Sequence, residues 1–78
     1  MTDFGNWVRA KRQLNHITRE QLAKKSGYSK SQLFRIETGQ TSPALNTAEN
    51  LATSFNMTLI TALEEAAIIK RLTKESKI

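Results

Sequence analysis

Two helix-start signals, eleven residues apart, constrain this chain more than any other feature of its sequence. Thr18 with Gln21, and Ser29 with Gln32, each have the spacing of a capping box, in which two side chains bond the free backbone groups of a helix start. Gly27 lies between them, at the position where the first of these helices must end. Two short helices joined by a turn this brief predict a helix-turn-helix unit.

The helix-turn-helix unit lies among three further predicted helices. The two capped helices extend over about 19–26 and 30–38. A first helix is predicted from about Asp3 to Leu14 and a fourth from about Leu45 to Phe55, each with apolar residues at helical spacing. The inward-facing residues predicted for these two helices are Phe4, Trp7, Val8, Lys11 and Leu14 in one, and Leu45, Ala48, Leu51, Ala52 and Phe55 in the other.

The last segment of the chain permits two interpretations. A fifth helix over about 59–74 would place Leu59, Ala62, Leu63, Ala66 and Ile69 on one stripe. Alternatively, residues 57–61 are rich enough in β-formers to make a short strand before a later helix. We favour the helix because Ala, Leu, Glu, Lys and Arg, all strong helix formers, dominate the residues after Thr61.

Length and composition restrict the class of protein. Seventy-eight residues allow a single domain, 1–78, which we expect to be an all-α, compact five-helix domain. The chain has no cysteine and one histidine, so no metal site, cofactor or disulfide is expected. The sequence also shows no combination of nucleophile, base and orienting group that would indicate an enzyme. Because no membrane-spanning run or secretion signal occurs, a cytoplasmic location is expected.

The charge of the chain is concentrated in its first half. The net charge is +5, and residues 1–43 carry eight Lys or Arg against three acidic residues, whereas residues 44–78 carry four of each. Such an asymmetry favours a polyanionic partner, with nucleic acid ahead of a membrane. A basic surface that only serves solubility is the alternative that charge alone leaves open.

The second helix of the unit has side chains suited to DNA. With Leu33 and Ile36 turned inward, five other residues face outward or sideways, namely Lys30, Ser31, Gln32, Phe34 and Arg35. Arg pairs with guanine, Gln with adenine, and Lys and Ser with base edges or phosphates. The capped helix starts at Thr18 and Ser29 add backbone N–H groups that suit a phosphate.

With these features the sequence resembles a known family, the Xre/Cro, lambda-repressor-like DNA-binding domains. Residues 17–39 read ITREQLAKKSGYSKSQLFRIETG and match that family's spaced Ile-Thr, Leu-Ala, Ser-Gly, capping Ser and Ile-Glu-x-Gly pattern. Residues 41–43 and 47–59 are also similar, so the resemblance covers roughly 4–63. Two positions depart from the pattern: His16 stands where the family has Gly, and Ala44 where it often has a capping Ser.

The resemblance implies roles for individual residues. It places the second helix of the unit in the major groove, with Lys30, Ser31 and Arg35 contacting bases and Gln32 contacting the DNA backbone. Arg19, where the family usually has Gln, would bind phosphate or guanine. Glu37 and Arg12 would form an internal, structural ion pair. The full set of expected DNA-contact residues is Arg19, Tyr28, Ser29, Lys30, Ser31, Gln32, Phe34 and Arg35.

Four residues have a structural interpretation beside a functional one. Phe34 suits either a thymine methyl group or the edge of the core, and Tyr28 either packs in the turn or donates its hydroxyl to a phosphate. Trp7 is expected in the core, and His16 in a turn.

The last helix suggests a second role, because apolar residues fall outside its inner stripe. We expect a homodimer formed through Leu59, Ile68, Ile69 and Leu72, as the resemblance implies for proteins that bind palindromic half-sites. The favoured function is a sequence-specific DNA-binding transcriptional regulator, a dimeric repressor of bacterial, phage or mobile-element origin that occupies an operator. The alternative is an antitoxin that binds a partner toxin and autoregulates its operon.

Overall fold

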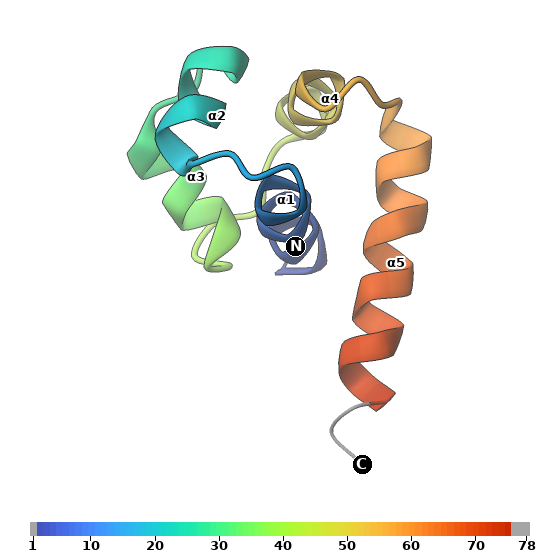
Figure 1. Cartoon of the computed structure of the whole chain (residues 1–78). Helices are drawn as coiled ribbons and strands as arrows, with labels where there is room; N and C mark the ends of the chain where they lie inside the picture. The colour runs from blue at the N-terminus through green and yellow to red at the C-terminus, as the bar shows by residue number, and fades with distance from the viewer. Residues whose placement is uncertain (1, 76–78) are drawn as a thin grey trace.

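The computed structural model of the chain describes residues 2–75, and for residues 2, 3 and 70–75 it describes the backbone alone. This part contains five α-helices and no strand: α1 (Thr2–Leu14), α2 (Arg19–Ser26), α3 (Lys30–Glu37), α4 (Leu45–Ser54) and α5 (Leu59–Glu75) (Figure 1). Each helix begins and ends within two residues of its predicted bounds. The all-α, five-helix prediction is therefore confirmed.

The segment that permitted a strand forms a helix start instead. The Thr58 hydroxyl oxygen accepts a bond from the backbone N–H of Thr61 at 3.2 Å, and its carbonyl accepts from Ala62 at 3.0 Å. The strand interpretation of residues 57–61 is therefore wrong, because local capping satisfies the backbone without a partner strand.

Both predicted capping boxes are present. The Thr18 hydroxyl accepts from the N–H of Gln21 at 3.0 Å, and the Gln21 side chain accepts from the N–H of Thr18 at 2.7 Å. The Ser29–Gln32 pair repeats this geometry at 3.1 and 2.9 Å. Gly27 ends α2 in the left-handed conformation, with φ of 84°. The two capping boxes therefore mark where α2 and α3 begin, and Gly27 marks where α2 ends.

The ends of α1, α3 and α4 share one geometry. After each helix a residue with positive φ closes a Schellman turn: His16 at 56°, Gly39 at 79° and Asn56 at 59°. For α1, the N–H of Ile17 bonds the carbonyl of Arg12, and that of His16 bonds Gln13. His16 thus fills a position that glycine adopts at lower cost.

The core is built around α1, which lies between the α2–α3 unit and α5 (Figure 1). Its fully buried large side chains come from four helices: Phe4, Trp7, Val8, Leu22, Leu33 and Leu51. Small residues of α4 and α5, including Ala52 and Ala62, let the backbones approach closely. The Trp7 ring meets Phe55 edge-on, with 5.6 Å between centroids, as predicted for a core tryptophan.

Three residues predicted on inner faces are exposed instead: Leu14 at 71%, Leu45 at 74% and Leu63 at 39%. Leu14 lies on the last turn of α1 and Leu45 on the first turn of α4, at the rim of a core too small to cover helix ends. Leu63 lies on the flank of α5, beside the inner stripe that runs through Ala62 and Ala66. The apolar periodicity of the sequence thus predicted the helices correctly, but the predicted burial of Leu14, Leu45 and Leu63 is wrong.

Gly5 allows α1 and α3 to pack in close contact. A Cβ atom at this position would stand 2.1 Å from the carbonyl oxygen of Ile36 and 3.1 Å from its carbonyl carbon. A glycine inside a helix normally weakens that helix. Here it permits the backbone of α3 to lie directly against α1, which positions the helix-turn-helix unit on the rest of the domain.

α5 is joined to α1 by polar bonds as well as apolar packing. The Trp7 indole Nε1–H donates to Glu65 Oε1 at 2.9 Å, and the Lys11 ammonium lies 3.1 Å from the same oxygen. Both interactions stabilise the charged carboxylate and lower the pKa of Glu65 below its ordinary value, with the indole bond as the larger cause. Within the described range no helix is long and apolar enough to cross a membrane.

Candidate nucleic-acid interface

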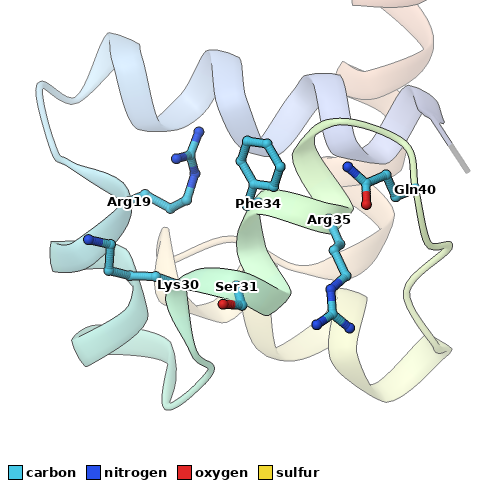
Figure 2. Close-up of a pocket in the computed structure, with 6 residues that line it drawn as sticks. All are labelled: Arg19, Lys30, Ser31, Phe34, Arg35 and Gln40. Atoms are coloured by element: carbon cyan, nitrogen blue, oxygen red, sulfur yellow. The ribbon is translucent and has the colours of Figure 1, made fainter.

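The outer face of α3 forms the candidate interface. Leu33 and Ile36 are buried against the core, whereas the five residues expected to face outward are all exposed: Lys30, Ser31, Gln32, Phe34 and Arg35. Part of this face lines a shallow depression of about 320 Å³, together with Arg19 of α2 and Gln40 after α3 (Figure 2). We call these six residues the α3 face: Arg19, Lys30, Ser31, Phe34, Arg35 and Gln40.

The α3 face is cationic. Three of its six residues carry a positive charge and none carries a negative one. In Figure 2 the Lys30 and Arg35 side chains extend to opposite sides of Ser31. An exposed helix about 10–12 Å across with cations at its flanks and a small hydroxyl between them fits the dimensions and charge of the major groove.

A buried carboxylate organises the residues behind the α3 face. The side chain of Glu37 is 1% exposed and accepts two bonds from Arg12, one from Nε at 3.0 Å and one from Nη2 at 3.1 Å. Arg12 also donates to the carbonyl of Ile17 at 3.2 Å. Arg12 and Glu37 thus join the end of α1, the turn before α2 and the end of α3, so the role of this pair is structural.

Arg19 is held by α3 rather than extended freely toward solvent. Its Nη2 lies 3.3 Å from Glu37 Oε1, and its guanidinium carbon lies 5.1 Å from the centre of the Phe34 ring. Its Nε is buried and has no hydrogen-bond partner among the described residues. Figure 2 shows its guanidinium beside the ring. Arg19 therefore bridges α2 and α3 through its Nη2 atom, and the remainder of its side chain lines the depression.

Ser29 and Gln32 use part of their hydrogen-bonding capacity in the capping box. The Ser29 oxygen and the Gln32 carbonyl oxygen each accept a backbone N–H. The amide NH2 group of Gln32 and the hydroxyl hydrogen of Ser29 are donors that capping does not consume. These donors suit an acceptor such as a phosphate oxygen or the acceptor atom of a base edge.

Tyr28 lies in the turn between α2 and α3 and is linked to α4. Its hydroxyl oxygen accepts a bond from Asn50 Nδ2 at 2.9 Å. A hydroxyl that accepts one bond keeps its hydrogen for another acceptor. Asn50, which sequence reasoning missed, therefore orients Tyr28 and leaves its hydroxyl hydrogen available to another acceptor. Gln40 was also missed, because it lies after the helix and only the turn brings it beside Phe34.

The residues expected at a dimer interface lie in different environments. Ile68 is 56% exposed on α5 and, with the exposed Leu14, lines an apolar groove between α5 and α1. Leu59 and Ile69 are half-buried against the core. The side chain of Leu72 lies outside the described residues. Ile60, at 73% exposed, is an apolar residue of α5 that sequence reasoning did not single out.

No group of three or more His, Asp or Glu side chains in the described part of the chain is placed to hold a metal ion. His16, the single histidine, is exposed in the turn after α1.

Comparison with known proteins agrees with this geometry. Residues 8–61, more than half of the chain, match the helix-turn-helix family. The fold is similar to that of the clp gene regulator ClgR from Corynebacterium glutamicum, with a TM-score of 0.85 and 21% identity over 97% of this chain and 81% of that chain. At this identity the likeness shows a shared fold. No curated protein sequence matches the chain.

The fold and the α3 face therefore define a DNA-binding protein of the helix-turn-helix class. The chain belongs to the helix-turn-helix family of Xre and lambda-repressor-like domains that its sequence resembles. Its biochemical class is that of a DNA-binding transcriptional regulator.

Proposed function

We propose that this protein is a cytoplasmic, homodimeric repressor that occupies a palindromic operator and blocks a promoter by steric exclusion. The observation that carries this proposal is the division of α3 into a buried face, Leu33 and Ile36, and an exposed face with Lys30, Ser31 and Arg35. A helix anchored along one side and cationic along the other is suited to insertion into the major groove.

In this proposal the residues of α3 have distinct tasks. Lys30, Ser31 and Arg35 contact base edges, with the Arg35 fork suited to the O6 and N7 atoms of guanine. The donors of Tyr28, Ser29 and Gln32 contact the DNA backbone and determine the register of the domain on the duplex.

Dimerisation completes the proposed site, because two α3 helices are needed to contact two half-sites about 34 Å apart. The exposure of Ile68 supports an interface along α5. We propose that Leu59, Ile69 and Leu72 flank this contact. The substitution Ile68→Lys is then expected to convert the dimer to a monomer in sedimentation equilibrium. Glu49→Lys, at an exposed acidic position of α4, is the control and is expected to leave the dimer intact.

The experiment that tests DNA recognition is fluorescence anisotropy with DNA from upstream of the protein's own gene, across a salt series. A scrambled duplex of equal length is the reference. We expect the upstream DNA to bind about 10³-fold more tightly than the scrambled duplex. Arg35→Ala and Lys30→Ala are expected to reduce this ratio.

Arg9→Ala is the control for loss of one exposed positive charge, since Arg9 is an exposed cation on α1 and is not a residue of the α3 face. It should leave the ratio unchanged. Equal, weak binding of both duplexes with a steep salt dependence contradicts the proposal, because it shows attraction to phosphates without base recognition.

An antitoxin function is the second candidate, and one observation favours it. The apolar groove of Ala10, Leu14, Ile68 and Ile69 lies between α1 and α5, away from α3, so a partner protein bound there would leave the DNA-binding face free. A toxin-like reading frame next to the gene, and co-purification of its product with this chain but not with a Leu14→Lys variant, would support this function.

A further inference from the structure

We propose that Phe34, held in place by Arg19, recognises the 5-methyl group of a thymine in the major groove. This inference rests on the proposed function, since it requires α3 to lie in that groove. It goes further by naming the base that Phe34 would recognise. The Phe34 side chain has no hydrogen-bonding group, so it can distinguish bases only by apolar contact.

Phe34 lies in a polar and charged environment. Its side chain is 45% exposed, although a phenylalanine gains stability by burial. The face around it is lined otherwise by cationic and polar residues: Arg19, Lys30, Ser31, Arg35 and Gln40. Figure 2 shows the ring between Arg19 and Gln40. A large apolar surface in the middle of a cationic depression suits an apolar group on an otherwise anionic ligand.

Thymine carries an apolar group of this kind. Among the four bases of DNA, it alone presents a methyl group in the major groove, and apolar side chains recognise that group by contact. The phosphates and the remaining base edges are polar or charged and are matched by Lys30, Arg35 and Ser31. Phe34 is thus complementary to the single apolar feature that the groove offers.

The Phe34 ring is supported by a series of charged side chains. The Arg19 guanidinium lies 5.1 Å from the ring centroid and is itself bound to Glu37 at 3.3 Å. Glu37 is fixed in turn by two bonds from Arg12. A planar guanidinium against an aromatic face restricts the ring. The series Arg12–Glu37–Arg19 therefore positions Phe34 before DNA arrives, so less conformational freedom is lost on binding.

The test first uses the full chain to select a duplex from a random-sequence library. The affinity for this duplex is then compared with the affinity for copies in which each thymidine is replaced in turn by deoxyuridine, which lacks only the methyl group. We expect one position in each half-site at which the replacement weakens binding by about fourfold, the value of one buried methyl group. Phe34→Ala should bind the thymidine and deoxyuridine duplexes equally. Phe34→Leu, which stays apolar, should keep part of the difference.

The same experiment tests whether Arg19 positions Phe34, by comparing how Arg19→Gln binds the thymidine and deoxyuridine duplexes. If Arg19→Gln weakens the thymidine and deoxyuridine duplexes by the same factor, Arg19 only contributes charge, and its positioning role is overturned. If the ratio between the two duplexes falls toward one, Arg19 positions Phe34. Leu14→Ala, which removes an exposed apolar side chain at the end of α1, is the control and should retain the wild-type ratio.

The outcomes distinguish failure of this inference from failure of the proposed function. A sequence-selective duplex whose binding is insensitive to every deoxyuridine replacement, or equally sensitive in wild type and Phe34→Ala, overturns the inference and leaves the proposed function intact. Failure to select any sequence overturns both. Circular dichroism of each variant establishes that the fold is retained.

Discussion

Arg12 binds Glu37 through both its Nε and Nη2 atoms, at 3.0 and 3.1 Å, across 25 residues of sequence. The carboxylate is almost fully buried and the guanidinium nearly so. The pair places the last residue of α3 against the last turn of α1. Because Arg19 uses the same carboxylate, one buried charge sets the position of both helices of the helix-turn-helix unit.

Glu37→Gln should lower the free energy of unfolding by about 3 kcal/mol, because it leaves the buried Arg12 guanidinium and that of Arg19 without a charged partner. Urea denaturation followed by circular dichroism measures this loss. Glu49→Gln, at an exposed position of α4, is the matched control and should change stability by less than about 0.5 kcal/mol. A similar small change for Glu37→Gln would show that the pair is dispensable.

Gly5→Ala should destabilise the domain by about 2–3 kcal/mol although alanine is the better helix former. The added methyl group would collide with the backbone carbonyl of Ile36, and backbone cannot move aside as a side chain can. Thermal unfolding measures the effect. Asn6→Ala, at the exposed neighbouring position of α1, should be neutral or stabilising. A Gly5→Ala protein as stable as wild type would mean that α3 does not approach α1 this closely.

His16→Gly should stabilise the domain by about 0.5–1 kcal/mol. The left-handed conformation costs a histidine more than a glycine, and this gain exceeds the extra entropy that glycine has in the unfolded chain. Gly39→Ala, at the equivalent position after α3, should have the opposite sign. The midpoint of urea unfolding is the measurement. Equal effects of the two substitutions would contradict the shared Schellman geometry.

The attachment of α5 to α1 should depend on pH through Glu65. Its pKa is lowered in the folded state, so its contribution to stability is present above the ordinary value of 4.5 and is lost as the pH falls through the lower folded value. Wild type should therefore lose more stability on acidification below pH 4.5 than Glu65→Gln, whose side chain does not titrate.

Glu64→Gln is the control for this pH dependence, because Glu64 is exposed on the same helix. It should show the full acid-dependent loss of wild type in urea unfolding from about pH 6 to about pH 3. An identical pH profile for wild type and Glu65→Gln would mean that the Glu65 carboxylate does not stabilise the attachment of α5.

The helices and their order follow from local features of the amino-acid sequence. Capping boxes at Thr18 and Ser29, and a glycine at position 27, are local signals, since each depends on bonds between residues at most four apart. The residues that α3 itself contributes to the α3 face were predictable for the same reason, because a short helix with Leu33 and Ile36 buried leaves few choices for its other side.

The contacts between the helices depend on how the whole chain packs. The exposure of Leu14, Leu45 and Leu63 depends on how far the neighbouring helices extend. The apolar periodicity of a single helix carries no information about that extent. The role of Gly5 appeared only when the backbone of α3 was placed against it. The stacking of Arg19 on Phe34, 15 residues apart, and the bond from Asn50 to Tyr28 likewise depend on helix crossing angles. Those angles result from the packing of the whole core around α1, a property that no local segment specifies.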